Sequence, residues 1–300
     1  MALSAKHAER PKLACEIGAD RVIAARASEN ASSVQIYTTR RLPPGTLAPG
    51  LASPNILQAE ALRQAISGSL NSVAGKSKDV IVVVPDSAVR VLLLDFETLP
   101  DKPEDAAAII RFRVKKSLPF DTAQAALSYH VANANGTLRV VAALSPMEVL
   151  KEYEAAVRDC GYAPGVVMPS TLAALGLVEA ERPTMVVKVD TNSISVAIVD
   201  RSFLLLLRTL ERPGRAEVDA RQLAEQIHPS MVFFEDTYSA KIEQIFVTGL
   251  ANIDQMDRSL QTEIGVQVSA LDAAQTASSE SLGDALPQAM LAGVGGALLS

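Results

Sequence analysis

Residues Val186–Asp200 have the sequence VVKVDTNSISVAIVD, and this stretch decides the fold. Apolar side chains alternate on either side of its centre: Val187, Val189, Ile194, Val196 and Ile198. Asp190 and Asn192 stand at the centre, and both residue types favour turns. The pattern predicts two antiparallel strands joined by a tight turn, which is a β-hairpin with a carboxylate at its tip.

A second stretch near the start of the chain, Leu13–Arg26 (LACEIGADRVIAAR), repeats this pattern. When the two stretches are aligned, Glu16 corresponds to Asp190 and Gly18 to Asn192. Two such hairpins predict a duplicated fold with a cleft between its halves. Backbone N–H groups of small turn residues cradle phosphates, and a nearby acid holds Mg²⁺ through water, so the cleft would fit a nucleotide. The alternative is that these residues serve only the turns.

Length and composition limit the classes of protein. The chain has 300 residues, 48% of them hydrophobic, which favours about two globular domains. Its net charge of −6 argues against nucleic acid as a partner, because phosphate binding needs clustered Lys and Arg. The sequence has no secretory signal and no run of roughly 20 apolar residues that would span a membrane. We therefore expect a cytoplasmic protein without direct membrane insertion.

The order of the predicted elements divides the chain into domains. We expect residues 1–12 to form a flexible leader, 13–185 a first domain and 186–300 a second. Within the first domain, a strand, a helix, two strands and a helix over about 88–162 predict an inserted α+β unit. The mixture of hairpins, buried strands and helices makes the fold class α/β.

The helix expected in the insertion ends in a basic strip, and an apolar segment follows it: Arg111, Arg113, Lys115, Lys116, Leu118 and Phe120. Two interpretations stay open. Cations near a helix C-terminus stabilise the helix by complementing its dipole. The same strip, with Leu118 and Phe120 as apolar anchors, would form a docking surface for a partner.

The sequence has no signature of catalysis or metal binding. His7, His130 and His228 lack acidic or Cys neighbours at ligand spacing. A serine hydrolase would need a Gly-x-Ser-x-Gly elbow, and the chain has none. We therefore predict no catalytic residue and no metal ligand.

The order of these features resembles the actin-like ATPase fold, a duplicated ribonuclease H-like architecture, and within it the PilM family of type IV pilus assembly proteins. The resemblance covers most of Leu13–Leu299 and is most specific in three stretches: Ile110–Val131, Tyr153–Ala174 and Leu291–Leu298. The cytoplasmic half of the type II secretion protein GspL looks like a near relative.

The resemblance implies a cytoplasmic protein that is peripheral to the inner membrane through its partners. Members of the family bind the N-terminal tail of the inner-membrane protein PilN in a groove beside the inserted subdomain, and they link it to other pilus assembly components. The basic strip with Leu118 and Phe120 is the expected contact for such a PilN-like tail.

Many members of the family also bind ATP, and six residues occupy the corresponding cleft here: Glu16, Gly18, Asp190, Asn192, Ser193 and Gly249. This chain departs from the family pattern at that cleft. Asp20 adds negative charge where the family usually has serine, and Asn192 stands where it usually has glycine. Gly249 is alone in a segment that usually holds several glycines, and residues 208–241 are short for a nucleotide-capping subdomain. We expect a degenerate site that binds neither ATP nor Mg²⁺.

The resemblance and the residues of the cleft leave three candidate functions, and we expect the first of them. It is a non-enzymatic scaffold or adaptor of a pilus or secretion machine that captures the tail of a membrane partner. The second is a nucleotide-dependent assembly ATPase of the same machine, which the paired acidic hairpins favour and Asp20 and Asn192 oppose. The third is a metabolic kinase, which ranks last because no residue set for a substrate stands out.

Overall fold

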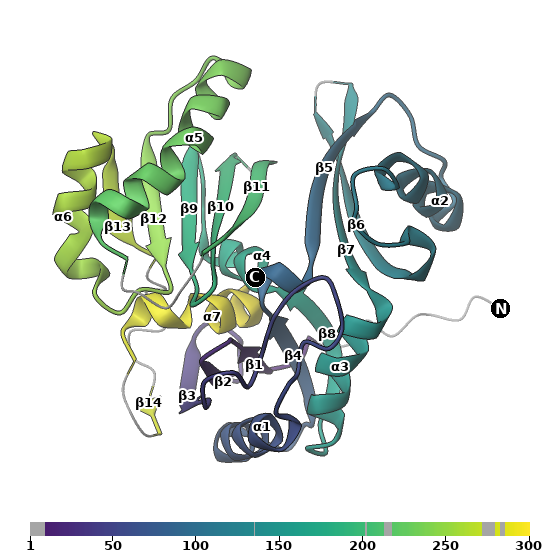
Figure 1. Cartoon of the computed structure of the whole chain (residues 1–300), viewed down its shortest axis with the longest axis vertical. Coiled ribbons are helices and arrows are strands. Elements are labelled where there is room, and N and C mark those ends of the chain that lie inside the picture. Colours follow the sequence, from purple (N-terminus) through teal and green to yellow (C-terminus); the bar gives the residue numbers. More distant parts are fainter. Residues whose placement is uncertain (1–9, 135, 202, 213–217, 272–279, 283–285) are drawn as a thin grey trace.

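The computed structural model describes residues 10–134, 136–201, 203–212, 218–271, 280–282 and 286–300. Two halves, each built on its own sheet, lie against each other, and a smaller unit projects from one of them (Figure 1). Residues 1–9 of the expected leader lie outside the described residues. Among the described residues, no helix is both long and apolar enough to cross a membrane.

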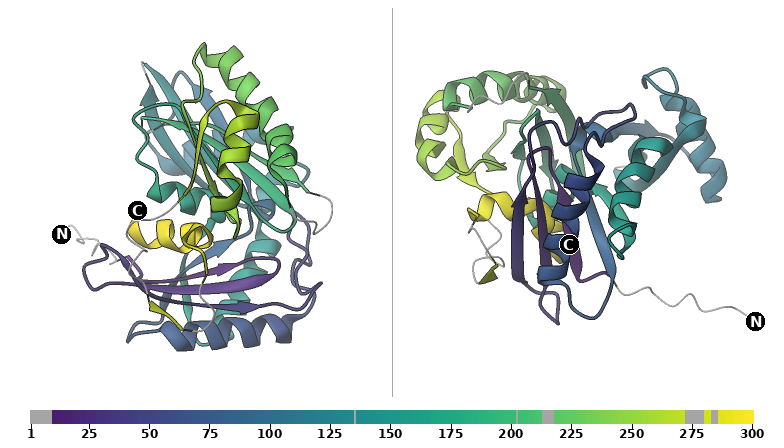
Figure 2. Two further views of the ribbon diagram at one scale, coloured as in Figure 1. Left: turned by 90° about the vertical axis from the view of Figure 1, so that its left-hand side faces the viewer. Right: turned by 60° about the horizontal axis from the view of Figure 1, so that its bottom comes forward.

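The first half is a sheet of six strands in the order β14-β3-β2-β1-β4-β8. Its strands are β1 Leu13–Ile17, β2 Arg21–Ala27, β3 Val34–Arg41, β4 Asp79–Val84, β8 Ala163–Pro169 and β14 Glu280–Ser281. Helix α1 (Ala59–Val73) covers one face, because Leu62, Ile66 and Leu70 recur every fourth residue and are fully buried. Figure 2 shows α1 on one face of this sheet and α7 on the other.

The second half repeats the hairpin in a sheet of five strands, in the order β11-β10-β9-β12-β13. Its strands are β9 Thr184–Val189, β10 Ser193–Asp200, β11 Phe203–Glu211, β12 Gln244–Thr248 and β13 Gln267–Ala270. Helices α5 (Ala220–Tyr238) and α6 (Ile253–Ile264) pack on one face. Between β11 and β12, the described residues contain α5 as their one helix, so the region expected to hold a nucleotide cap is reduced to that helix.

The inserted unit is a three-stranded sheet, in the order β5-β7-β6, with one helix on it. Its elements are β5 Arg90–Phe96, α2 Pro103–Val114, η2 Thr122–Gln124, β6 Ala125–Ala134 and β7 Thr137–Pro146, and the short turn η1 Asp86–Ala88 leads into it. Ile110 and Val114 of α2 are buried against Val140, Ala142 and Leu144 of β7, which gives the unit a small core of its own.

Helix α3 (Met147–Arg158) was expected to close the insertion, but the structure packs it against the first half. Its buried residues Val149, Tyr153 and Val157 recur every fourth position and join the cluster of α1. The Tyr153 hydroxyl also bonds Asn55 Oδ1 at 3.1 Å. The spacing that predicted the helix could not indicate which core its apolar stripe would meet.

The last helix, α7 (Ala292–Leu299), also lies in the first half, although its residues were assigned to the second. It follows the turn η5 (Gln288–Leu291), and it contacts α4 (Ser170–Ala174) and η3 (Leu175–Leu177). A side chain on Gly296 would place its Cβ 2.0 Å from the carbonyl oxygen of Ala173. Small residues therefore let α7 approach α4 closely, at the junction of the two halves.

Candidate functional site

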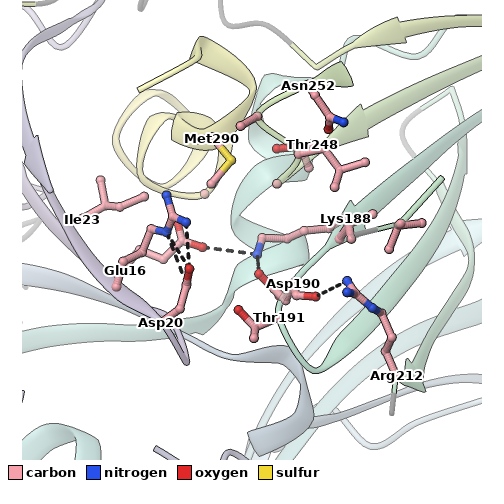
Figure 3. A pocket seen from close by; sticks show the side chains of 18 of the residues that line it. Glu16, Asp20, Ile23, Lys188, Asp190, Thr191, Arg212, Thr248, Asn252 and Met290 are labelled. Carbon is pink, nitrogen blue, oxygen red and sulfur yellow. Dashed lines mark hydrogen bonds and ion pairs between the residues drawn. The ribbon is translucent and has the colours of Figure 1, made fainter. Parts of the chain in front are cut away.

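A cleft of about 650 Å³ opens between the two halves, and both hairpins contribute to its wall (Figure 3). Four of the six residues predicted for a nucleotide line it: Glu16, Gly18, Asp190 and Gly249. The other two, Asn192 and Ser193, line a smaller hollow of about 20 Å³, which shares Glu16, Gly18 and Asp190 with the main cleft. The alignment of the hairpins therefore located residues that lie close together.

The residue at the centre of the cleft is Lys188, which the sequence argument missed. It lies on β9 with its side chain only 5% exposed. Its Nζ is 2.5 Å from Asp190 Oδ1 and 3.4 Å from Glu16 Oε1 (Figure 3). Because Glu16 belongs to the first half and Asp190 to the second, the ammonium joins carboxylates from both hairpins.

A third carboxylate, Asp86, is buried and near enough to raise the pKa of Lys188. It accepts hydrogen bonds from the backbone N–H of Thr171 at 2.9 Å and from the Thr171 hydroxyl at 2.5 Å. The neighbouring Ser170 hydroxyl donates to Glu16 Oε1 at 2.5 Å. The first residues of α4 therefore hold two of the three acids in place.

The charges of this cluster follow from burial and from the Lys188 ammonium. The Arg212 guanidinium lies close by, and its Nη1 donates to the Asp190 carbonyl oxygen at 3.3 Å. Burial lowers the pKa of Lys188, but the carboxylates of Asp190, Glu16 and Asp86 raise it by more, so the amine stays protonated. Burial raises the pKa of Glu16 even though Lys188 and Ser170 oppose the rise. Burial likewise raises the pKa of Asp86. One ammonium faces three carboxylates, and Asp190 is the one it contacts most closely.

Charged and backbone groups of the cleft wall also pair with one another. Asp20, which we expected to leave negative charge near a phosphate, is bound by Arg21, with Nη2 and Oδ2 2.7 Å apart. Gly18 N–H donates to the carbonyl oxygen of Arg21 at 2.9 Å, and Asp190 N–H donates to that of Ser193 at 2.8 Å. These two N–H groups therefore close their own hairpins and are not directed at a ligand.

The acids of the two hairpins are paired with an amine in this structure. Mg²⁺ would have to be held, through water, by the acids of the two hairpins, and both of these acids contact the Lys188 ammonium. A buried positive charge at that point repels a divalent cation. Across the described residues, no group of three or more His, Cys, Asp or Glu side chains is arranged to hold a metal ion.

Some of the residues predicted to contact a partner are bound or packed within the insertion, and the others are exposed. Arg111 Nη1 donates to the carbonyl oxygens of Thr122 and Ala125, so its guanidinium ties α2 to the chain that follows it. Leu118 and Phe120 are half-buried and pack against the core of the insertion. Part of each side chain stays accessible, so their contact with a partner stays a prediction.

The exposed part of the strip is on α2 itself and just after it. Arg113, Lys115 and Lys116 are exposed there. Two apolar side chains that the sequence argument passed over lie beside them, Ile109 at 41% and Phe112 at 83% exposure. The outer face of α2 is therefore a mixed apolar and basic surface.

A groove of about 840 Å³ lies between the insertion and the second half. From the insertion it is lined by His130, Ala132, Arg139 and Val141. In the β6–β7 ladder, His130 is opposite Val141 and Ala132 is opposite Arg139, so these four share one face of the sheet. The buried side chains under α2 occupy the alternate positions of β7, so the groove and α2 are on opposite faces.

The duplicated hairpin sheets, the facing acids and the inserted unit together define an actin-like fold, as the sequence predicted. No protein-family model matches the sequence, and no curated protein matches it either. A chain of the PilM–PilN type IV pilus biogenesis complex is similar over 91% of this chain and 91% of its own, with a TM-score of 0.77 and 18% sequence identity.

Two further solved structures support this assignment of the fold. The cytoplasmic domain of EpsL, an inner-membrane component of the type II secretion system of Vibrio cholerae, is similar over 96% of this chain and 94% of its own, with a TM-score of 0.53 and 13% identity. A Bacteroides thetaiotaomicron protein described as having an actin-like ATPase fold is similar over 85% and 88%, with a TM-score of 0.51 and 11% identity. The predicted fold is thus confirmed.

Proposed function

We propose that this protein is a non-enzymatic adaptor of a type IV pilus or related secretion machine and belongs with the PilM-like proteins. In this proposal it lies on the cytoplasmic side of the inner membrane and binds the N-terminal tail of a PilN-like membrane partner. The observation that carries the proposal is the likeness, over 91% of both chains, to a chain of the PilM–PilN complex. The likeness to the EpsL cytoplasmic domain points to the same class of machine.

The groove beside the insertion is the site that we assign to the tail. It is bounded by the sheet of the insertion, by β10 and β11 of the second half and by residues 172–181. Its lining combines Val141, Phe203 and Leu204 with the charged residues Arg139 and Glu179. An extended peptide offers apolar side chains and charges in alternation, which suits such a lining. The outer face of α2, with Phe112 and Arg113, is the competing site on the same unit.

A nucleotide-dependent ATPase is the second candidate, and the cleft between the hairpins is the observation that favours it. The Lys188 cluster opposes it, because the acids that would hold Mg²⁺ are already paired. Binding of the tail would not require a nucleotide in that cleft. The two candidates are therefore separated by testing the groove and the cleft independently.

The proposal predicts that a charge placed in the groove will weaken tail binding. The measurement is fluorescence anisotropy of a labelled peptide that carries the N-terminal tail of the membrane partner. Val141→Glu, inside the groove, should raise the dissociation constant at least tenfold, which is about 1.4 kcal/mol. The matched control is Val131→Glu, because Val131 is 37% exposed and lies on the other face of the same sheet.

Two results would change the proposal, one by placing the tail-binding site elsewhere and one by rejecting the adaptor function. If Phe112→Ala weakens binding while Val141→Glu does not, the tail binds the outer face of α2. If the wild-type protein does not bind the tail at all, the adaptor proposal fails. Circular dichroism of each variant confirms that the fold is retained.

A further inference from the structure

We propose that Lys188 is a built-in cation that takes the place of a divalent metal between the two acidic hairpins and joins the halves of the fold without a nucleotide. The inference concerns the cleft and does not depend on which partner occupies the groove. It rests on the position of one amine, on the acids around it, and on the elements that hold those acids.

The amine is placed by the register of β9. Its neighbours Val187 and Val189 belong to the cluster under α5 and α6, so the alternate position points Lys188 to the opposite face, toward the first half. Val186, two residues earlier on that face, packs against Ala174 and Ala292. The side chain of Lys188 therefore reaches the junction between the halves.

The surrounding elements position Glu16 and Asp190 to pair with the Lys188 ammonium. Glu16 accepts from the Ser170 hydroxyl, and a side chain at Gly293 of α7 would place its Cβ 2.3 Å from Glu16 Oε2. Glu16 is thus confined between α4 and α7, with its side chain 10% exposed. Asp190, at the tip of the other hairpin, is 29% exposed and makes the shorter contact with Lys188.

A metal and this amine would compete for the same two carboxylates. A divalent ion held by Glu16 and Asp190 would stand beside a buried ammonium, and like charges repel strongly where water is excluded. The cleft should therefore reject Mg²⁺ and should not gain stability from Mg²⁺ with ATP.

The first experiment is a thermal melt of the wild-type protein with MgCl₂, with MnCl₂, and with MgCl₂ plus ATP. We expect an unchanged Tm in all three conditions, because nothing binds the folded state preferentially. A rise in Tm with MgCl₂ plus ATP would overturn the inference. Isothermal titration calorimetry with the same solutions gives an independent measurement.

The second experiment removes the amine. Lys188→Ala should lower Tm by about 5 °C or more, since it leaves buried carboxylates unpaired, and MgCl₂ or MnCl₂ should restore part of the loss. The matched control is Lys241→Ala, because Lys241 pairs with Glu235 on the surface with its side chain 80% exposed. A Lys188→Ala protein as stable as Lys241→Ala, or one that no divalent ion stabilises, would contradict the proposal.

A third variant covers the case in which Lys188→Ala does not fold. Lys188→Met combined with Asp190→Asn removes the ammonium together with the carboxylate that it contacts most closely. Recovery of folded protein in the double variant, relative to Lys188→Met alone, supports the pairing. Absence of recovery counts against it, and the wild-type titrations still decide whether the cleft accepts a metal.

Discussion

Lys188 pairs with a carboxylate from each of the two acidic hairpins. The five remaining residues of β9 are a threonine, a methionine and three valines, and all six positions of the strand are buried. A lysine tolerates such a place only when carboxylates surround it, and here Asp190, Glu16 and Asp86 do so. The cluster has more acid than base, so proton binding to its acids should affect stability.

The buried carboxyl of Glu16 gives a pH prediction with a definite sign. Burial raises its pKa above the ordinary 4.5, so the folded state keeps that proton to higher pH than the unfolded chain does. The free energy of unfolding should therefore fall as pH rises from about 4.5 through the raised pKa. Glu16→Gln cannot titrate, so the free energy of unfolding of the wild type minus that of the variant should decrease between acid and neutral pH.

Urea denaturation of both proteins from about pH 4 to pH 8 measures this difference. Glu60→Gln is the control of opposite sign, because hydrogen bonds from Arg63 and Gln64 lower the pKa of exposed Glu60. Its wild-type-minus-variant difference should increase with pH through the acid range. If the Glu16 difference also increases with pH, burial does not control the Glu16 carboxyl.

The sequence predicted two of the three acids of this cluster, but neither Asp86 nor the lysine between them. Glu16 and Asp190 were found because each stands at a fixed position in a local pattern that occurs twice. Lys188 lies in the same hairpin, yet its partner Glu16 is 172 positions earlier, and no local pattern indicates that pairing. The available signal was a lysine within an otherwise apolar strand, which predicts a buried acid without identifying it.

At the scale of elements, the junction of β12 and α6 depends on a glycine that we first assigned to nucleotide binding. Gly249 has φ +84°, and a Cβ there would lie 2.1 Å from the carbonyl oxygen of Val189. Its N–H donates to the carbonyl oxygen of Ala289 at 3.1 Å. The glycine therefore lets β12 pass close to the tip of the second hairpin.

Replacing Gly249 should distinguish two causes of lost stability: a steric clash with the Val189 carbonyl oxygen and the strain of a left-handed backbone. Gly249→Ala should lower the free energy of unfolding by about 3 kcal/mol or more, because a backbone oxygen cannot move aside at little cost. Gly265→Ala is the matched control, since Gly265 has φ +76° and a Cβ added there would meet no atom within 4 Å. It should cost about 1 kcal/mol, the ordinary penalty for a left-handed residue. Equal losses in urea melts would show that close approach is unimportant.

The insertion shows where sequence patterns stop being informative. The helix predicted within the insertion is confirmed as α2, which begins at Pro103 and has Glu104 and Asp105 in its first turn. These helix-end signals could not place Leu118 and Phe120, because both follow the helix and their direction depends on how the chain returns over β6. The sequence also could not indicate that Phe112, between Arg111 and Arg113, would remain exposed.

For the whole molecule, the C-terminal segment connects the two halves. The carbonyl oxygen of Ala289 accepts hydrogen bonds from the N–H of Gly249 and from the hydroxyl of Thr248, both at the end of β12. Five residues later, Val294 is fully buried in the cluster that includes Ala14 and Ile81 of the first sheet. An Ala- and Gly-rich helix has little amphipathic pattern, so the sequence did not indicate that α7 crosses to the first half.

This connection predicts that the two halves unfold together. Val294→Ala leaves a cavity in the first half and should cost about 1–3 kcal/mol. Hydrogen exchange followed by mass spectrometry should then show an equal loss of protection in β4 of the first half and in β12 of the second, because η5 and α7 tie both to one opening event. Val114→Ala is the matched control, since Val114 is equally buried but belongs to the small core of the insertion. It should increase exchange in β6 and β7 and leave β4 and β12 protected. If Val294→Ala affects β4 alone, the halves open independently, and Lys188 and the C-terminal segment do not couple them.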